Sequence, residues 1–118
     1  MSRDCVLPAL DPVIHAQPRL RITVALAALG PDDMITFSRL QELAGMTAGN
    51  LATHLRKLEE AGYITITKSY HHRLPVTYLA LTRLGRRALE DYTAALRDLL
   101  AVLAAGSEVN GGTKEKPS

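Results

Sequence analysis

The feature that most constrains this chain is the segment TAGNLATHLRKLEEAGYI, residues 47–64. Leu51, Leu55 and Leu58 recur at the spacing of one helical face, because an α-helix has about 3.6 residues per turn. Most of the opposite face is small, polar or basic, and it is made up of Gly49, Asn50, Thr53, Arg56 and Lys57. The segment therefore predicts a helix over about residues 48–61 that packs by its leucines and leaves a polar face exposed.

A shorter helix is predicted immediately upstream. Thr36 is a plausible N-cap, and the apolar residues that follow it share one side: Phe37, Leu40, Leu43 and Ala44. Gly45 can end this helix, and Thr47 can cap the next one. Two helices joined by a turn of about three residues that contains glycine are typical of a helix-turn-helix motif.

The region before this motif predicts one more helix. Residues 1–10 show no periodicity and are expected to form an extended arm. Residues 11–29 predict a helix that Asp11 can cap and that breaks or kinks near Pro18. Gly30 and the proline after it should end this helix.

The region after the motif predicts a β-hairpin. Residues 63–69 and 74–81 alternate between apolar and polar side chains and are rich in β-branched residues. The sequence YHHR, residues 70–73, lies between them and should form a short polar tip.

A final helix is predicted over residues 83–105, with Thr82 as its cap. Its apolar side chains step by three and four, as in a coiled-coil seam: Leu89, Tyr92, Leu96, Leu99 and Leu103. The seam exceeds what a small core needs, so we expect a second copy to cover it in a two-fold dimer. The alternative is a helix that folds back on its own core.

Gly106 should end the helix, and residues 106–118 are expected to be a disordered tail.

Composition excludes several function classes. The length of 118 residues suits one domain, and the single cysteine, Cys5, excludes an intrachain disulfide and a four-cysteine zinc site. We expect Cys5 to be incidental.

No signal peptide and no membrane-spanning segment is evident, so the protein is expected to be soluble and cytoplasmic. No glycine-rich phosphate loop, zinc-protease motif or catalytic triad is present, which predicts a non-enzyme without a cofactor.

Charge is unevenly distributed along the chain. Thr47 to Arg87 contains seven basic side chains and two acidic ones, Glu59 and Glu60, which gives this segment a net charge of +5, whereas the whole chain carries +2. Such asymmetry favours a basic face that meets a polyanion, although a solvated surface with uneven charge would look similar.

The exposed face of the helix over residues 48–61 fits a helix that enters the major groove of DNA. Gly49 lets the backbone approach the duplex, at a cost of about 1 kcal/mol in helix propensity. Asn50 and Thr53 can hydrogen-bond base edges, and Arg56 and Lys57 can reach phosphates. His54 lies on the flank of the leucine stripe, where a packing or phosphate-facing role is favoured over base recognition.

Two segments, GNLATHLRKLEEAGYI and RLPVTYLALTRLGRRAL, resemble the winged helix DNA-binding domain of small prokaryotic transcriptional regulators related to the MarR and ArsR groups. The likeness covers roughly residues 10–100. It implies a mainly α-helical winged helix-turn-helix fold with a small β-hairpin and a long C-terminal dimerisation helix. It also implies a homodimer that binds operator DNA sequence-specifically, with the hairpin as a wing. Repression is the expected outcome, since no activation segment is apparent.

The wing adds a second set of predicted contacts. Arg73 at its tip can enter the minor groove or contact a phosphate. His71 and His72 could bind a metal, but two adjacent histidines in a turn are a weak signal; their protonation could instead raise DNA affinity at lower pH. The full predicted DNA-binding set is Thr47, Gly49, Asn50, Thr53, His54, Arg56, Lys57, Lys68 and Arg73.

The main alternative is a winged helix that binds another protein and not DNA. Such a module should expose apolar residues on the outward face of the third helix, where this chain has none. RNA binding is less favoured, because no aromatic stacking platform is present. The predicted partners are therefore double-stranded DNA, a second copy of the chain and an effector that the sequence does not identify.

Overall fold

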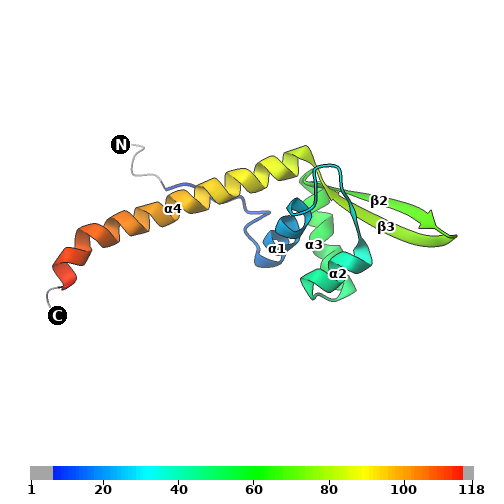
Figure 1. The fold of residues 1–118 in the computed structure, drawn as a ribbon, viewed down its shortest axis with the longest axis horizontal. Coiled ribbons are helices and arrows are strands. Elements are labelled where there is room, and N and C mark those ends of the chain that lie inside the picture. The colour runs from blue at the N-terminus through cyan, green and yellow to red at the C-terminus, as the bar shows by residue number, and fades with distance from the viewer. Residues whose placement is uncertain (1–6, 116–118) are drawn as a thin grey trace.

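The computed structural model describes the backbone of residues 7–115 and the side chains of residues 7–106, so Cys5 lies outside the described residues. The chain forms helices and strands in the order α1 (Gln17–Ala27), β1 (Ile35–Thr36), α2 (Phe37–Ala44), α3 (Ala48–Glu60), β2 (Ile64–His71), β3 (Leu74–Leu81) and α4 (Arg83–Glu115). The strands pair antiparallel in the order β1-β3-β2. This is the predicted mainly α-helical winged helix fold. Figure 1 shows α1 to α3 gathered in one lobe, with the β2–β3 hairpin and α4 extending from it in opposite directions.

The start of α1 shows why Pro18 interrupts the pattern. Asp11 caps a single turn, in which its Oδ1 accepts hydrogen bonds from the backbone N–H of Val13 at 2.8 Å and of Ile14 at 3.3 Å. The helix itself begins only at Gln17, so that Pro18 occupies the first turn, where its missing N–H costs nothing. It ends at Ala27, earlier than the predicted end at Gly30.

The helix-turn-helix forms as predicted from its capping residues. Thr36 Oγ1 accepts from the N–H of Arg39, and Thr47 Oγ1 accepts from the N–H of Asn50, each at 3.1 Å. Gly45 ends α2 with a positive φ of 64°, a conformation that glycine adopts without a steric cost.

The leucines of α3 lie at the centre of the core. Leu51, Leu55 and Leu58 are at most 2 % exposed. They pack with apolar residues of the other elements, namely Ile22, Leu26, Leu40, Ile64, Leu79 and Leu81. Burial of each such side chain stabilises the fold by about 1.5–3 kcal/mol, so this cluster fixes α3 against the rest of the lobe.

The hairpin turn is tighter than the predicted four-residue tip. His71 pairs with Leu74, which leaves a two-residue turn made of His72 and Arg73. Both have positive φ, 54° and 68°, as a type I′ turn requires. The sequence also gave no sign of β1, whose two residues pair with Leu79 and Tyr78 of β3.

Helix α4 begins in close contact with the end of α3. Thr82 Oγ1 accepts from the N–H of Gly85 at 2.9 Å, as predicted for a cap, and donates to the carbonyl of Gly62 at 2.7 Å. A Cβ at Gly85 would lie 2.1 Å from the carbonyl oxygen of Tyr63, so only glycine fits there.

The far end of α4 corrects a prediction. The helix continues through Gly106 to Glu115, whereas the sequence predicted an end at Gly106 and a disordered tail over residues 106–118. Glycine disfavours a helix by about 1 kcal/mol and does not by itself end one. Residues 116–118 of that tail lie outside the described residues. No helix in the described part of the chain is long and apolar enough to cross a membrane.

Candidate nucleic-acid interface

The polar face of α3 is open to solvent. Its five predicted members, Gly49, Asn50, Thr53, Arg56 and Lys57, are all exposed, and so is the capping residue Thr47. A Cβ placed on Gly49 would meet no atom within 4 Å. The protein's own packing therefore does not require glycine at this position, and a partner surface can approach the backbone there.

Two side chains on this face differ in how free their polar groups are. Thr53 Oγ1 donates to the carbonyl of Gly49 at 3.0 Å, so its hydroxyl can still accept a hydrogen bond but its hydrogen is engaged. Among residues 7–106, no hydrogen bond involves the side-chain amide of Asn50. Asn50 thus presents two donors and one acceptor oxygen to solvent, and Thr53 presents an acceptor and a methyl group.

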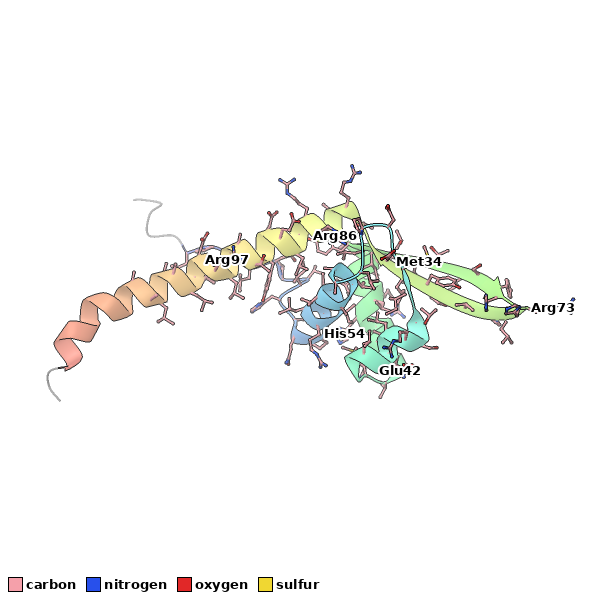
Figure 2. All side chains as sticks on the ribbon, in the orientation of Figure 1. Met34, Glu42, His54, Arg73, Arg86 and Arg97 are labelled. Carbon is pink, nitrogen blue, oxygen red and sulfur yellow. The ribbon has the colours of Figure 1, made fainter. Side chains whose placement is uncertain are left out.

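His54 lies on the flank of α3, partly buried, and faces α1 (Figure 2). Its Nδ1 lies 3.3 Å from Nη1 of Arg19. Burial first, and then the positive charges of Arg19 and Lys57, hold the pKa of His54 below its usual value of 6.5. The ring is therefore neutral at pH 7, with Nδ1 accepting from the guanidinium. The charge pattern of the sequence does not point to Arg19, because this residue lies outside the basic segment.

Hollows flank α3 on both sides. The wing-side hollow, of about 310 Å³, lies between α3 and the β2–β3 hairpin; its charged lining residues are Arg56, Glu59 and Lys68. The α1-side hollow, of about 360 Å³, has Arg19, Lys57 and Glu60 as its charged lining residues. Each hollow therefore combines two cations with one carboxylate and carries a net positive charge.

The hairpin carries its charge at the far end. Arg73 is exposed and projects from the tip (Figure 2). Lys68 is exposed midway along β2. The rings of His71 and His72 pack edge to face, with centroids 4.1 Å apart. Among the described residues no group of three or more His, Cys, Asp or Glu side chains could hold a metal ion.

The predicted seam on α4 divides into two parts. Leu89 and Tyr92 are buried within the chain, where they pack against Ile14 in a second small cluster. The Tyr92 hydroxyl also lies 3.1 Å from Nδ1 of His15. Leu96 is partly buried against this cluster, whereas Leu103 is 69 % exposed. For Leu89 and Tyr92 the structure thus shows the helix packed on its own core, and only the later seam is left uncovered.

A polar contact joins the N-terminal turn to the end of α3. The Tyr63 hydroxyl donates to Oδ2 of Asp11 at 2.5 Å. This hydrogen bond, followed by burial and the negative charge of Asp11, raises the pKa of Tyr63 to about 12. Beside the contact lies a cavity of about 300 Å³, lined on the α4 side by Leu84, Arg87, Ala88, Asp91 and Tyr92.

Comparisons with known proteins agree with this geometry. A family model described as a winged helix DNA-binding domain matches residues 19–100. An uncharacterized protein of Methanocaldococcus jannaschii is 32 % identical over 80 residues, which are 68 % of this chain and 84 % of that protein. A transcriptional regulator homologue from Pyrococcus horikoshii has a similar structure, with a TM-score of 0.69 and 27 % identity over 77 % of this chain and 87 % of that one. A MarR family transcriptional regulator from Silicibacter pomeroyi shares the fold, with a TM-score of 0.56 and 22 % identity over 86 % of this chain and 70 % of that one.

Proposed function

This chain belongs to the winged helix DNA-binding domain family, and we propose that it is a sequence-specific transcriptional regulator that binds duplex DNA as a homodimer and represses transcription. The observation that carries the proposal is the polar face of α3, which the protein's own fold leaves uncovered. A protein-binding module would be expected to expose apolar side chains on this face.

In the proposed complex, the N-terminal half of α3 lies in the major groove. Asn50 binds a base edge through its amide, and Thr53 contributes an acceptor and a methyl group. Gly49 allows the helix backbone close to the bases. Arg56, further along the exposed face, neutralises a backbone phosphate.

The hairpin serves as the wing in this proposal. Arg73 projects furthest from the lobe, and a guanidinium at this position suits a narrow minor groove beside the half-site. Lys68, midway along β2, shares the wing-side hollow with Arg56 and binds the adjoining backbone. The wing therefore adds affinity along the flank of the half-site.

The dimer is proposed to form through the uncovered part of α4. Its exposed apolar residues there include Leu100, Val102 and Leu103, which are 56 %, 52 % and 69 % exposed. Leu96 and Leu99 continue the stripe toward the lobe. A two-fold dimer would present two α3 helices to half-sites about 34 Å apart, one turn of DNA.

An effector is the remaining proposed partner. The cavity beside Tyr63 lies between the lobe and α4, the element that sets the spacing of the two lobes in the dimer. A small molecule that binds there would change DNA affinity by altering this spacing. Raised thermal stability in the presence of a ligand, lost when Ala88 is replaced by a bulky residue, would identify such an effector.

Selection of bound duplexes from a random pool tests the proposed function. We expect enrichment of an inverted repeat whose half-sites lie one helical turn apart. A pool that stays random after repeated selection, with the protein folded throughout, would reject sequence-specific DNA binding.

A further inference from the structure

Arg19 is a basic residue that the proposed function has so far left without a role. Its side chain is partly buried and points into the α1-side hollow. Nε donates to the carbonyl of Val13 at 2.6 Å, and Nη1 lies 3.3 Å from Nδ1 of His54. These two contacts hold the guanidinium beside α3, so it has fewer accessible rotamers than an arginine side chain that extends into solvent.

The two contacts leave most of the guanidinium unused. Arginine has five N–H donors, of which Val13 and His54 engage one each. Among residues 7–106 the ion pairs are Arg39–Glu42 and Arg87–Asp91, so neither Arg19 nor Lys57 has a carboxylate partner. The hollow thus holds two cations that are in no ion pair and that have donors free for an anion.

His54 lies beside both cations. Burial lowers its pKa most, and the positive charges of Arg19 on α1 and Lys57 on its own helix lower it further. Glu60, which also lines the hollow, forms no ion pair with either cation. An anion placed between the two cations would stabilise protonated His54 and so raise its pKa.

The position of the hollow matches a particular feature of DNA. A helix in the major groove, which is about 12 Å wide, has one sugar-phosphate backbone on each side. On the wing side of α3, Arg56 and Lys68 line the hollow that would lie beside one of these backbones. On the other side, the α1-side hollow offers the corresponding pair, Arg19 and Lys57.

We propose that Arg19 and Lys57, together with His54, form a binding site for one backbone phosphate of the DNA strand that passes the α1 side of α3. The inference rests on the proposed function, because it assumes that α3 occupies the major groove. It adds a contact from outside the helix-turn-helix. Arg19 contacts the duplex from α1, while Val13 and His54 hold the Arg19 guanidinium in place.

Fluorescence anisotropy over a range of salt concentrations tests the site, with the selected duplex and an unrelated duplex as probes. Arg19→Gln should weaken binding to both duplexes by the same factor, about three- to tenfold, and make the slope of log K against log salt shallower by about 1. Arg21→Gln is the matched control, since Arg21 is exposed on the opposite side of α1 and should leave the slope unchanged. Glu60→Gln should strengthen binding.

Two further readouts separate a phosphate contact from a loss of structure. Arg19→Lys keeps the charge and should retain the slope even where it loses stability measured by thermal melting. In the wild-type protein, the pKa of His54 followed by NMR should rise when the duplex is added. A folded Arg19→Gln protein with the wild-type salt slope, or a His54 pKa that DNA leaves unchanged, would overturn this inference alone. A wild-type protein that binds neither duplex would overturn the proposed function as well.

Discussion

The Tyr63 hydroxyl donates a hydrogen bond to the Asp11 carboxylate at 2.5 Å and so joins the N-terminal turn to the junction of α3 and β2. The two residues are 52 positions apart in the sequence. The same turn buries Ile14 against Ala88, Leu89 and Tyr92 of α4. The N-terminal turn therefore holds α4 against the lobe that contains α3.

Removal of the polar contact between Tyr63 and Asp11 should destabilise the fold. Tyr63→Phe is expected to lower the free energy of unfolding by about 1–2 kcal/mol, since a hydrogen bond to a charged acceptor is lost. Urea denaturation at pH 7 measures this. The control is Tyr70→Phe, because Tyr70 is 74 % exposed and its hydroxyl should matter by less than about 0.5 kcal/mol.

The same contact sets an alkaline limit on stability. The Tyr63 hydroxyl has a pKa of about 12 in the folded protein, above its ordinary value of 10.0. The stabilisation is therefore fully present below pH 10 and is lost as pH rises through about 12. Equal alkaline loss of stability in wild type and Tyr63→Phe would show that this pair contributes nothing.

His54 should produce the opposite dependence at acidic pH. Its pKa is lowered in the folded protein, so the unfolded chain binds a proton more readily. The stability linked to His54 is complete above pH 6.5 and falls as pH drops toward its folded pKa. His54→Gln should flatten this part of the stability curve, measured by urea midpoints between pH 5 and 7.5. A His54→Gln protein with the wild-type curve would show that His54 contributes nothing to this dependence.

Base recognition should depend on Asn50 more than on its neighbours. Asn50→Ala is expected to weaken binding to the selected duplex by about 1–3 kcal/mol and to leave binding to unrelated DNA unchanged. Arg56→Ala, six residues further along α3, should weaken both and make the salt slope shallower. If Asn50→Ala instead loses affinity equally for the selected and the unrelated duplex, the side chain contacts the DNA backbone and not a base.

Local sequence was sufficient to predict the elements that surround this face. Thr36, Gly45 and Thr47 act on atoms within a few residues of themselves, so capping chemistry located α2 and α3. The leucine spacing likewise identified the buried side of α3. A strand of two residues is too short to show an alternation of apolar and polar side chains, so β1 could not be predicted from the sequence.

Contacts between distant segments could not be predicted in the same way. The heptad spacing on α4 correctly marked an apolar stripe, but it could not show that Ile14 covers Leu89 and Tyr92. Likewise Arg19 has an unremarkable sequence context, and its position beside His54 depends on how α1 packs on α3. Spacing along one helix identifies an apolar face and says nothing about which segment covers it.

The two parts of the α4 seam should respond differently to the same substitution. Leu103→Glu is expected to give a folded monomer with weak operator affinity, because Leu103 is exposed in the single chain and would be covered in the proposed dimer. Leu89→Glu should unfold the chain, since it buries a charge within the protomer. Sedimentation and circular dichroism measure the two outcomes, with Arg97→Glu as an exposed control on the same helix. A dimeric Leu103→Glu protein would place the interface elsewhere.

In the proposed complex the exposed face of α3 lies against a duplex, so a bulky side chain at Gly49 should block DNA binding. The space around Gly49 is empty, so Gly49→Leu should fold normally and gain up to about 1 kcal/mol of stability from better helix propensity. Gly106→Leu is the matched control, because Gly106 is also helical and unobstructed but lies far along α4.

The deciding measurement is the affinity of these two variants for the selected duplex, together with their melting temperatures. We predict that Gly49→Leu melts no lower than wild type but binds the duplex at least about tenfold more weakly, whereas Gly106→Leu binds like wild type. A stable Gly49→Leu protein that binds with wild-type affinity would contradict the claim that α3 enters the major groove by this face.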